Sequence, residues 1–525
     1  MNITSFIRSL RWLVSSAEPQ AQRPKHDWSL SLPKRLHVKT DLAVTLTLLL
    51  TVSCGQRISV SGNIEESPEI FPDYAGVTIP SNIAPLNFSY LGDEPAALIV
   101  EGKSGARQFT GHKGLFSFPM SYWRKLMENN AGSDVNLTIT VKRGGKWLAF
   151  KPFTISISAD KIDPYLSYRL IPPGYQAWKK VGIYQRNLET YSQTAIFENS
   201  LTGGNCVNCH TYCQRDPSKM LFHARADFGG TAMILDDKVE KLNTKTDSTI
   251  SALVYPYWHP SGKYVAFSVN ATNQNFFSHN KNRIEVYDSA SDVVVYDVDK
   301  HEITWSPLTR SKDSFETFPT FSPDGRSLYF CSAKAVSPMP QEYSKVKYSL
   351  CRIDFNPENA SFGDMVDTLY NGAWNGKSVS FPRISPDGKF LVFTLHEYGN
   401  FSIWHKDADL WAINLLTEDV FPLDAANSED VDSYHSWSGN SRWLVFSSRR
   451  IDGLYTRPFF CHIDENGQAS KPFLLPQKNP LEYYADQMNS YNLPELMERK
   501  ATVNAHDIAS ALRDTPGTDI TVRQR

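Results

Sequence analysis

The chain has 525 residues, of which 41% are apolar and 21% charged, so it is too long for one core and too apolar to be disordered throughout. We expect two or three domains. The formal net charge of −2 excludes the strongly basic surface by which proteins bind nucleic acid. Aromatic residues make up 12% of the chain, and short strand-like runs separated by Gly and Pro predict an all-β protein.

An apolar run near the N-terminus, Leu42 to Val52, is followed by Ser53 and Cys54. It is too short to span a bilayer core of about 30 Å, but it fits the apolar part of a signal peptide. A small residue followed by Cys resembles the lipidation site of bacterial lipoproteins of the Bacteroidetes type. The resemblance implies export, a lipid on Cys54 as the sole membrane contact, and a periplasmic or outer-membrane location. A buried strand with a chance cysteine is the alternative, and Val38 is an alternative start.

Residues 55–160 follow this export segment (1–54) and carry a polar stretch and then short strands. Residues 135–141 and 147–157 alternate apolar and polar side chains around a Gly-Gly turn, which is typical of a hairpin. Residues 120–129 form a candidate helix. We predict a small β-sandwich of the immunoglobulin or fibronectin type, without a recognisable site.

From residue 251 onward one motif recurs. Each copy has an aromatic residue, usually a proline, an apolar anchor, a polar turn, a basic residue and an alternating strand. The copies are YPYWHPSGKYVAFS from Tyr255, FPTFSPDGRSLYFC from Phe318, FPRISPDGKFLVFT from Phe381 and YHSWSGNSRWLVFS from Tyr434. Two further strands follow each copy, so every unit supplies the four strands of a propeller blade.

These repeats resemble the TolB-type, WD-like blades marked by Trp-Ser-Pro-Asp-Gly-Lys, over residues 205–476. The resemblance implies a β-propeller, which we place at 161–478, with 479–525 as a C-terminal extension. We favour six blades, with five or seven as alternatives. Residues 180–199 form an outer strand pair without an evident inner pair. A fifth, degenerate copy begins at Arg215, and in that alignment His223 replaces the packing residue Phe267.

Cys206, Cys209 and His210 spell C-x-x-C-H, the attachment motif of c-type haem. In that interpretation the two thiols bind the vinyl groups and His210 binds the haem iron. Met220 or His223 would supply a sixth ligand.

Two other interpretations of these residues stay open: a disulfide among the cysteines, and zinc bound by the three thiols with His210. A thioredoxin-type redox pair lacks its usual βαβ context. The other cysteines, Cys331, Cys351 and Cys461, are expected to be buried thiols.

Other polar residues lie at or near loops that lead into the blades, where propellers gather ligand groups around their axis. They are His259, Glu316, Arg383, Asp432 and His435. Capping of turns is the plainer interpretation for each. Residues 399–411 mix aromatics with His405 and Asp407, and we favour a solvated loop over a sugar- or peptide-binding groove.

The sequence contains no G-x-S-x-G, phosphate-binding loop or H-E-x-x-H motif. We therefore expect a non-catalytic binding scaffold for an envelope protein, a peptide or a glycan. A haem electron-transfer protein using Cys206, Cys209 and His210 is the alternative, and a glycan-active propeller enzyme is a weaker one.

Overall fold

The structure is a computed structural model that describes residues 58–172, 180–278 and 281–524. Residues 60–525 form one compact unit. The predicted signal segment, Val38 and Cys54 lie outside the described residues. Within them the chain is mostly β-strand, as predicted, and no described helix is long and apolar enough to cross a membrane.

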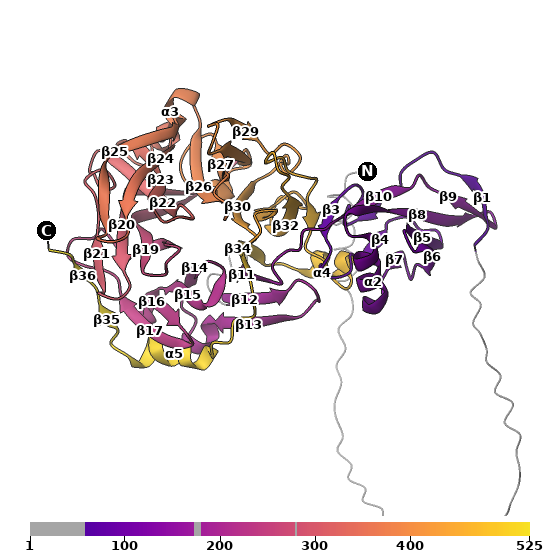
Figure 1. Ribbon diagram of the computed structural model, residues 1–525, viewed down its shortest axis with the longest axis horizontal. Coiled ribbons are helices and arrows are strands. Elements are labelled where there is room, and N and C mark those ends of the chain that lie inside the picture. Colours follow the sequence, from indigo (N-terminus) through magenta and orange to yellow (C-terminus); the bar gives the residue numbers. More distant parts are fainter. Residues whose placement is uncertain (1–57, 173–179, 279–280, 525) are drawn as a thin grey trace, which may run out of the picture. The chain divides into compact units, whose positions relative to one another are not determined.

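The first part of this unit is a small β-sandwich with one helix (Figure 1). The predicted hairpin and the predicted helix are both present. The larger sheet contains β1 (Val60–Asn63), β3 (Thr78–Pro80), β5 (Ala96–Gly102), β6 (Gly105–Thr110), β8 (Ser133–Arg143), β9 (Lys146–Ala149) and β10 (Phe153–Ser158). The smaller sheet contains β2 (Ile70–Phe71), β4 (Phe88–Tyr90) and β7 (Leu115–Phe116), and the helix is α2 (Met120–Asn130).

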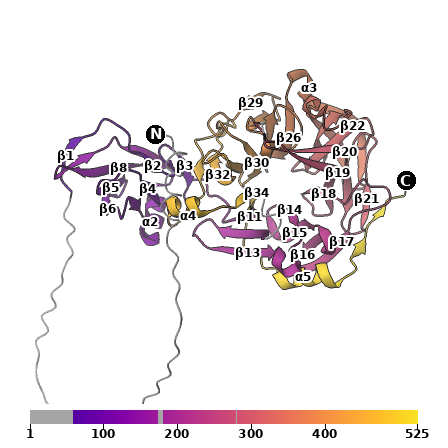
Figure 2. The ribbon, with the colours of Figure 1, turned by 180° about the vertical axis from the view of Figure 1, so that it is seen from behind.

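The second part is a propeller of six described blades, each built on four antiparallel strands (Figures 1 and 2). We number the blades along the chain, and strands are given from the inner edge outward. Blade 1 is β34 (Ser490–Met497), β11 (Tyr165–Ile171), β12 (Gly182–Asn187) and β13 (Gln193–Glu198). Blade 2 is β14 (Val207–Cys213), β15 (Asp216–Ala224), β16 (Gly230–Leu235) and β17 (Lys238–Asn243). Blade 3 is β18 (Val254–Trp258), β19 (Tyr264–Phe276), β20 (Ile284–Asp297) and β21 (Glu302–Thr304).

The last three blades follow the repeat closely. Blade 4 is β22 (Ser314–Phe321), β23 (Ser327–Lys334), β24 (Ser349–Asn356) and β25 (Ser361–Tyr370). Blade 5 is β26 (Ser378–Ile384), β27 (Phe390–His396), β28 (Asp409–Asn414) and β29 (Val420–Pro422). Blade 6 is β30 (Asp432–Trp437), β31 (Trp443–Ser448), β32 (Arg457–His462) and β33 (Phe473–Leu474). The six blades agree with the favoured number.

The ring closes in blade 1, where strands from both ends of the propeller meet. The predicted outer pair is β12 and β13, and its inner partners are β11 and the C-terminal strand β34. The segment after residue 478 is therefore not a separate extension. It begins with α4 (Pro480–Asp486) and then supplies the last inner strand.

Blade 2 corrects the alignment of the degenerate repeat. Its first hairpin turns through Gln214 and Arg215, both with positive φ, instead of the longer turn of the other copies. Thr211 consequently pairs with Leu221, as Tyr257 pairs with Ala266 in blade 3. The register therefore puts Phe222 at the position of Phe267, and His223 lies one residue later, at the position of Ser268.

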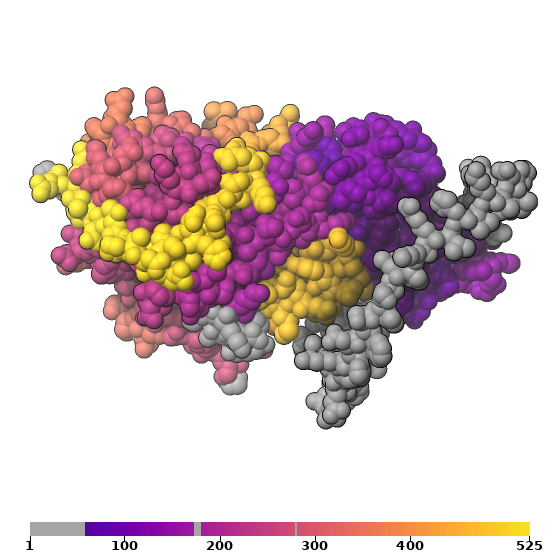
Figure 3. Space-filling view, turned by 90° about the horizontal axis from the view of Figure 1, so that it is seen from below, coloured from indigo at the N-terminus to yellow at the C-terminus, as the bar shows by residue number. Residues whose placement is uncertain are grey.

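The C-terminal segment is a strap across the outside of the propeller. Helix α5 (Ala505–Asp514) packs Ile508 and Leu512 into the core shared by blades 1 and 2. Strands β35 (Thr518–Asp519) and β36 (Thr521–Val522) then extend the outer edges of blades 2 and 3. Figure 3 shows this segment in yellow along the magenta blade. The polar C-terminal residues of this segment thus pair with the sheets.

Candidate functional site

Six residues, one on each inner strand, form a belt around the propeller axis. Every one has φ between 49° and 56°, and the strand register shifts at or beside each one. Non-glycine residues avoid this conformation, so its sixfold repetition marks a common bulge that is maintained by the fold. The belt residues are Cys209, Tyr255, Phe318, Phe381, Tyr434 and Leu493.

The aromatic members of the belt contact one another around the ring. Ring centroids of Tyr255 and Phe318 are 4.9 Å apart, those of Phe318 and Phe381 5.8 Å, and those of Phe381 and Tyr434 4.9 Å. The residue after the belt residue is proline in four strands, where the bulge needs no N–H donor, and histidine in the other two. The histidines are His210 and His435.

One end of the channel is closed by the loop before β28. Phe401 of this loop lies 6.0 Å from Tyr255 and 6.2 Å from Phe318, and Asn400, Ser402 and His405 are fully buried. The preferred interpretation of 399–411 as a solvated loop is therefore wrong. This loop therefore closes the channel at the end where the inner strands begin.

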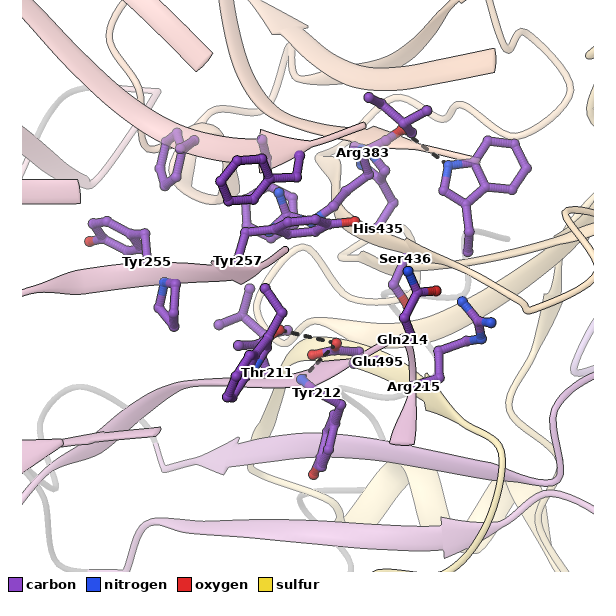
Figure 4. Close-up of a pocket in the computed structure, with 18 of the residues that line it drawn as sticks. Thr211, Tyr212, Gln214, Arg215, Tyr255, Tyr257, Arg383, His435, Ser436 and Glu495 are labelled. Carbon is purple, nitrogen blue, oxygen red and sulfur yellow. Dashed lines mark hydrogen bonds between the residues drawn. The ribbon is translucent and has the colours of Figure 1, made fainter. Parts of the chain in front are cut away.

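On the other side of the belt the channel holds a cavity of about 120 Å³ (Figure 4). All six inner strands contribute to its lining. Among the described lining residues the charged groups are Arg215, Arg383 and Glu495. Figure 4 shows Arg383 and His435 facing Thr211 and Glu495 across this space.

Arg383 is held at the wall by aromatic rings and a carbonyl. Its guanidinium carbon lies 3.9 Å from the ring centroid of Phe381 and 4.9 Å from that of Tyr257, and Nη1 donates to the Pro382 carbonyl at 2.8 Å. Among the described residues it has no ion pair. Burial lowers the pKa of Arg383, but a guanidinium stays protonated in proteins. The wall of the cavity thus contains a cation.

Glu495 is fixed on the opposite side. Its Oε1 accepts from the backbone N–H of Tyr212 and from the hydroxyl of Thr211, both at 3.2 Å. No described residue donates to Oε2. Burial raises the pKa of Glu495 to about 7, although the two donors and the charges of Arg383 and Arg215 act in the opposite direction. Arg215 itself lies 4.0 Å from Asp163.

Two uncharged histidines complete the polar lining. Burial lowers the pKa of His210 to about 3 and that of His435 to about 3, so both are neutral at physiological pH. His435 Nε2 donates to the Val392 carbonyl at 2.9 Å, which leaves Nδ1 as an acceptor without a described partner. Both ring nitrogens of His210 are buried without a hydrogen bond of ordinary geometry. Three buried ring nitrogens at the cavity wall therefore lack a hydrogen-bond partner among the described residues.

The C-x-x-C-H residues lie in β14 and just before it, not in a separate haem module. Cys206 and Cys209 are 7% and 5% exposed and are free thiols, as are the other four described cysteines. Burial raises the pKa of the Cys209 thiol. The expected burial of Cys331, Cys351 and Cys461 is confirmed. No group of three or more metal-ligating side chains occurs within the described ranges, so the zinc interpretation has no support.

Haem does not fit this geometry. The cavity beside His210 has about 120 Å³, whereas pockets for small organic ligands typically have roughly 300–1,000 Å³. Met220 is fully buried in the core of blades 1 and 2, and His223 Nδ1 lies 3.4 Å from the Thr231 hydroxyl. Neither residue lines the cavity. Haem attachment stays a prediction, tested by a reduced-minus-oxidised spectrum, and we derive no chemistry through it.

The remaining sequence candidates separate into two groups. Arg383 and His435 line the cavity. His259 instead bonds Ser261 and the Gly325 carbonyl between blades 3 and 4, a turn-capping role. Asp432 pairs with Arg450 at 2.6 Å, and Glu316 accepts from Ser332 at 3.2 Å. Both lie before the belt, away from the cavity.

The comparisons with known proteins leave the function undetermined. No family model matches the chain, and no curated protein matches it. A solved prolyl oligopeptidase B from Galerina marginata, bound to a 25mer macrocyclization substrate, is similar at 10% identity with a TM-score of 0.35. The match covers 59% of this chain and 45% of that one. A chain described as a dipeptidyl aminopeptidase IV from Bacteroides ovatus is similar at 13% identity with a TM-score of 0.22, over 60% of this chain and 61% of that one. The chain thus spans less than half of the Galerina structure.

Proposed function

We propose that this protein is an exported, lipid-anchored binding protein whose propeller cavity takes a small carboxylate-bearing ligand without chemically changing it. The export and the lipid anchor rest on the sequence around Cys54. The binding role rests on the cavity, and the observation that carries it is the guanidinium of Arg383, which lines the cavity without an ion-pair partner among the described residues.

Arg383 is a partly buried cation without an ion pair among the described residues, and such a group is a candidate for binding a ligand of opposite charge. Arginine presents a planar set of donors that matches both oxygens of a carboxylate. The rings of Phe381 and Tyr257 hold the guanidinium in place before a ligand arrives. Pre-organisation of this kind reduces the entropy lost on binding.

The lining also favours binding over catalysis. A glycan-cleaving site of the common type uses two carboxyl groups that flank the bond, whereas Glu495 is the single carboxyl group of the described lining. The histidine with a bonded ring nitrogen, His435, is engaged with a backbone carbonyl rather than with a hydroxyl or thiol. No nucleophile is therefore activated by a base in the described cavity.

Calorimetric titration of the full-length protein with acetate and propionate tests this proposal. We expect binding that Arg383→Gln weakens roughly 10- to 100-fold, since hydrogen bonds to charged groups contribute about 1.5–3 kcal/mol. Arg326→Gln is the matched control, because Arg326 is an exposed turn residue of the same repeat. Equal affinity of the Arg383→Gln variant, or no binding to the wild type, contradicts the proposal.

A further inference from the structure

The cavity carries two opposite charges that do not meet. Arg383 lies on β26 of blade 5 and Glu495 on β34 of blade 1, with blade 6 between them. The two side chains influence each other electrostatically, yet they form no ion pair.

Each charge is held on its own side by neighbours. The backbone carbonyl of Arg383 accepts from Trp437 Nε1 at 3.1 Å, and its guanidinium rests on two aromatic rings. The donors of Thr211 and Tyr212, from blade 2, turn Oε1 of Glu495 away from blade 5. Each of the two charges therefore has contacts on its own side of the cavity.

We propose that the cavity binds a small free amino acid, with its carboxylate on Arg383 and its ammonium group on Glu495. The inference rests on the proposed function and narrows its ligand to a zwitterion. A volume of about 120 Å³ suits a molecule of a few non-hydrogen atoms and is too small for a peptide or a sugar chain. The aromatic side chains of the belt line the end of the cavity, and the carbon atoms of the ligand pack against them.

The protonation state of Glu495 makes the affinity for this ligand depend on pH. Because burial raises its pKa to about 7, part of the population is protonated at neutral pH. An ammonium group favours the ionised form, so binding releases a proton and the affinity rises with pH through about 7. A simple carboxylate on Arg383 gains nothing from ionisation of Glu495.

The other groups around Glu495 do not produce the same pH dependence. Arg383 and Arg215 are the charged groups that act on it, and arginine keeps its charge. His210 and His435 change charge only near pH 3. Burial raises the pKa values of the phenols of Tyr212, Tyr255 and Tyr434, which therefore remain neutral.

The experiment compares amino acids with carboxylates of equal length on the full-length protein by calorimetry. The ligands are glycine, β-alanine and γ-aminobutyrate, each against acetate, propionate or butyrate, at pH 6 and pH 8. We expect at least one amino acid to bind about tenfold tighter than its carboxylate partner at pH 8, with a smaller preference at pH 6.

Two variants localise the preference. Glu495→Gln keeps the shape of the side chain and should remove the preference for amino acids while carboxylate binding through Arg383 persists. Glu316→Gln is the matched control, because Glu316 is also a buried carboxyl group with a pKa raised to about 7, but it lies outside the cavity lining. It should keep the preference.

The outcomes separate the two proposals. Equal affinity for each amino acid and its carboxylate in the wild type overturns the zwitterion and leaves the carboxylate site standing. A preference that survives Glu495→Gln also overturns it. Absence of binding by every ligand overturns both proposals.

Discussion

The two ends of the propeller channel differ in the surroundings of their buried charged side chains. At the end where the inner strands begin, Asp432 has Arg450 at 2.6 Å and Asp288 accepts from Thr272, Asn270 and Asn400 within 2.7 Å, whereas Oε2 of Glu316 is buried there without a described partner. At the cavity end Arg383 has no carboxylate partner, and Glu495 uses one of its two oxygens. Arg383 and Glu495 line the cavity, whereas the described charged groups before the belt do not. We infer that the first end is structural and the second binds a ligand.

The largest effect is expected from breaking a pair at the structural end. Asp432→Ala should lower the free energy of unfolding by about 3–5 kcal/mol, because it leaves the partly buried guanidinium of Arg450 without its counter-charge. Urea unfolding measures this change. Asp367→Ala is the control. Asp367 on β25 forms an exposed ion pair with Arg352 of β24, and exposed ion pairs contribute roughly 0–1 kcal/mol. Equal losses in the two variants would argue against a difference between buried and exposed pairs.

A smaller, pH-dependent effect is expected at Glu495. Below pH 4.5 its carboxyl group is protonated in both folded and unfolded chains. As the pH rises towards 7, the unfolded chain ionises first, so the wild type loses stability. Glu495→Gln should therefore raise the free energy of unfolding by roughly 1–3 kcal/mol at pH 8, after allowance for water in the cavity, and have little effect at pH 4. Urea unfolding at both pH values measures it, and a gain that is the same at pH 4 would contradict the raised pKa.

Arg383→Gln should change stability least among the charge substitutions. The variant removes a cation that has no ion pair among the described residues, so no buried counter-charge is left without its partner. We expect a change within about 1 kcal/mol in either direction, in contrast to Asp432→Ala. The same urea measurement, without ligand, checks it. A loss as large as that of Asp432→Ala would mean that Arg383 belongs to the scaffold.

The repeated motif predicted most of the propeller because its turn residues and alternating strands are local signals. The ring closure was not visible in the sequence, since β11 and β34 pair across more than 300 residues and Leu493-Pro494-Glu495-Leu496 keeps only the proline and the anchor of the repeat. Blade 2 was visible but misaligned, because its turn is shorter than that of the other copies. A short turn moved His223 by one position and left Phe222 in the packing layer.

The candidate site was predicted in part. Arg383 and His435 were identified from their place in the repeat, whereas Glu495 was missed together with its strand. Alignment of that strand with the other copies places Glu495 at the position of Arg383, which is the signal that would have found it. His210 was assigned to haem from the C-x-x-C-H spacing, but the register shows Cys209 in the belt and His210 at the position of His435. The position of Cys209 and His210 in the repeat therefore predicts their location better than the C-x-x-C-H motif does.

The most direct test of the cavity as a carboxylate site is a crystal structure of the protein grown with an excess of β-alanine. We expect ligand density between β26 and β34, with the carboxylate within hydrogen-bond distance of Arg383 and the ammonium group beside Glu495. Density for a carboxylate at Arg383 alone would support the carboxylate site and contradict the binding of an amino acid. An empty cavity, or Arg383 and Glu495 in direct contact, would contradict a carboxylate site at Arg383.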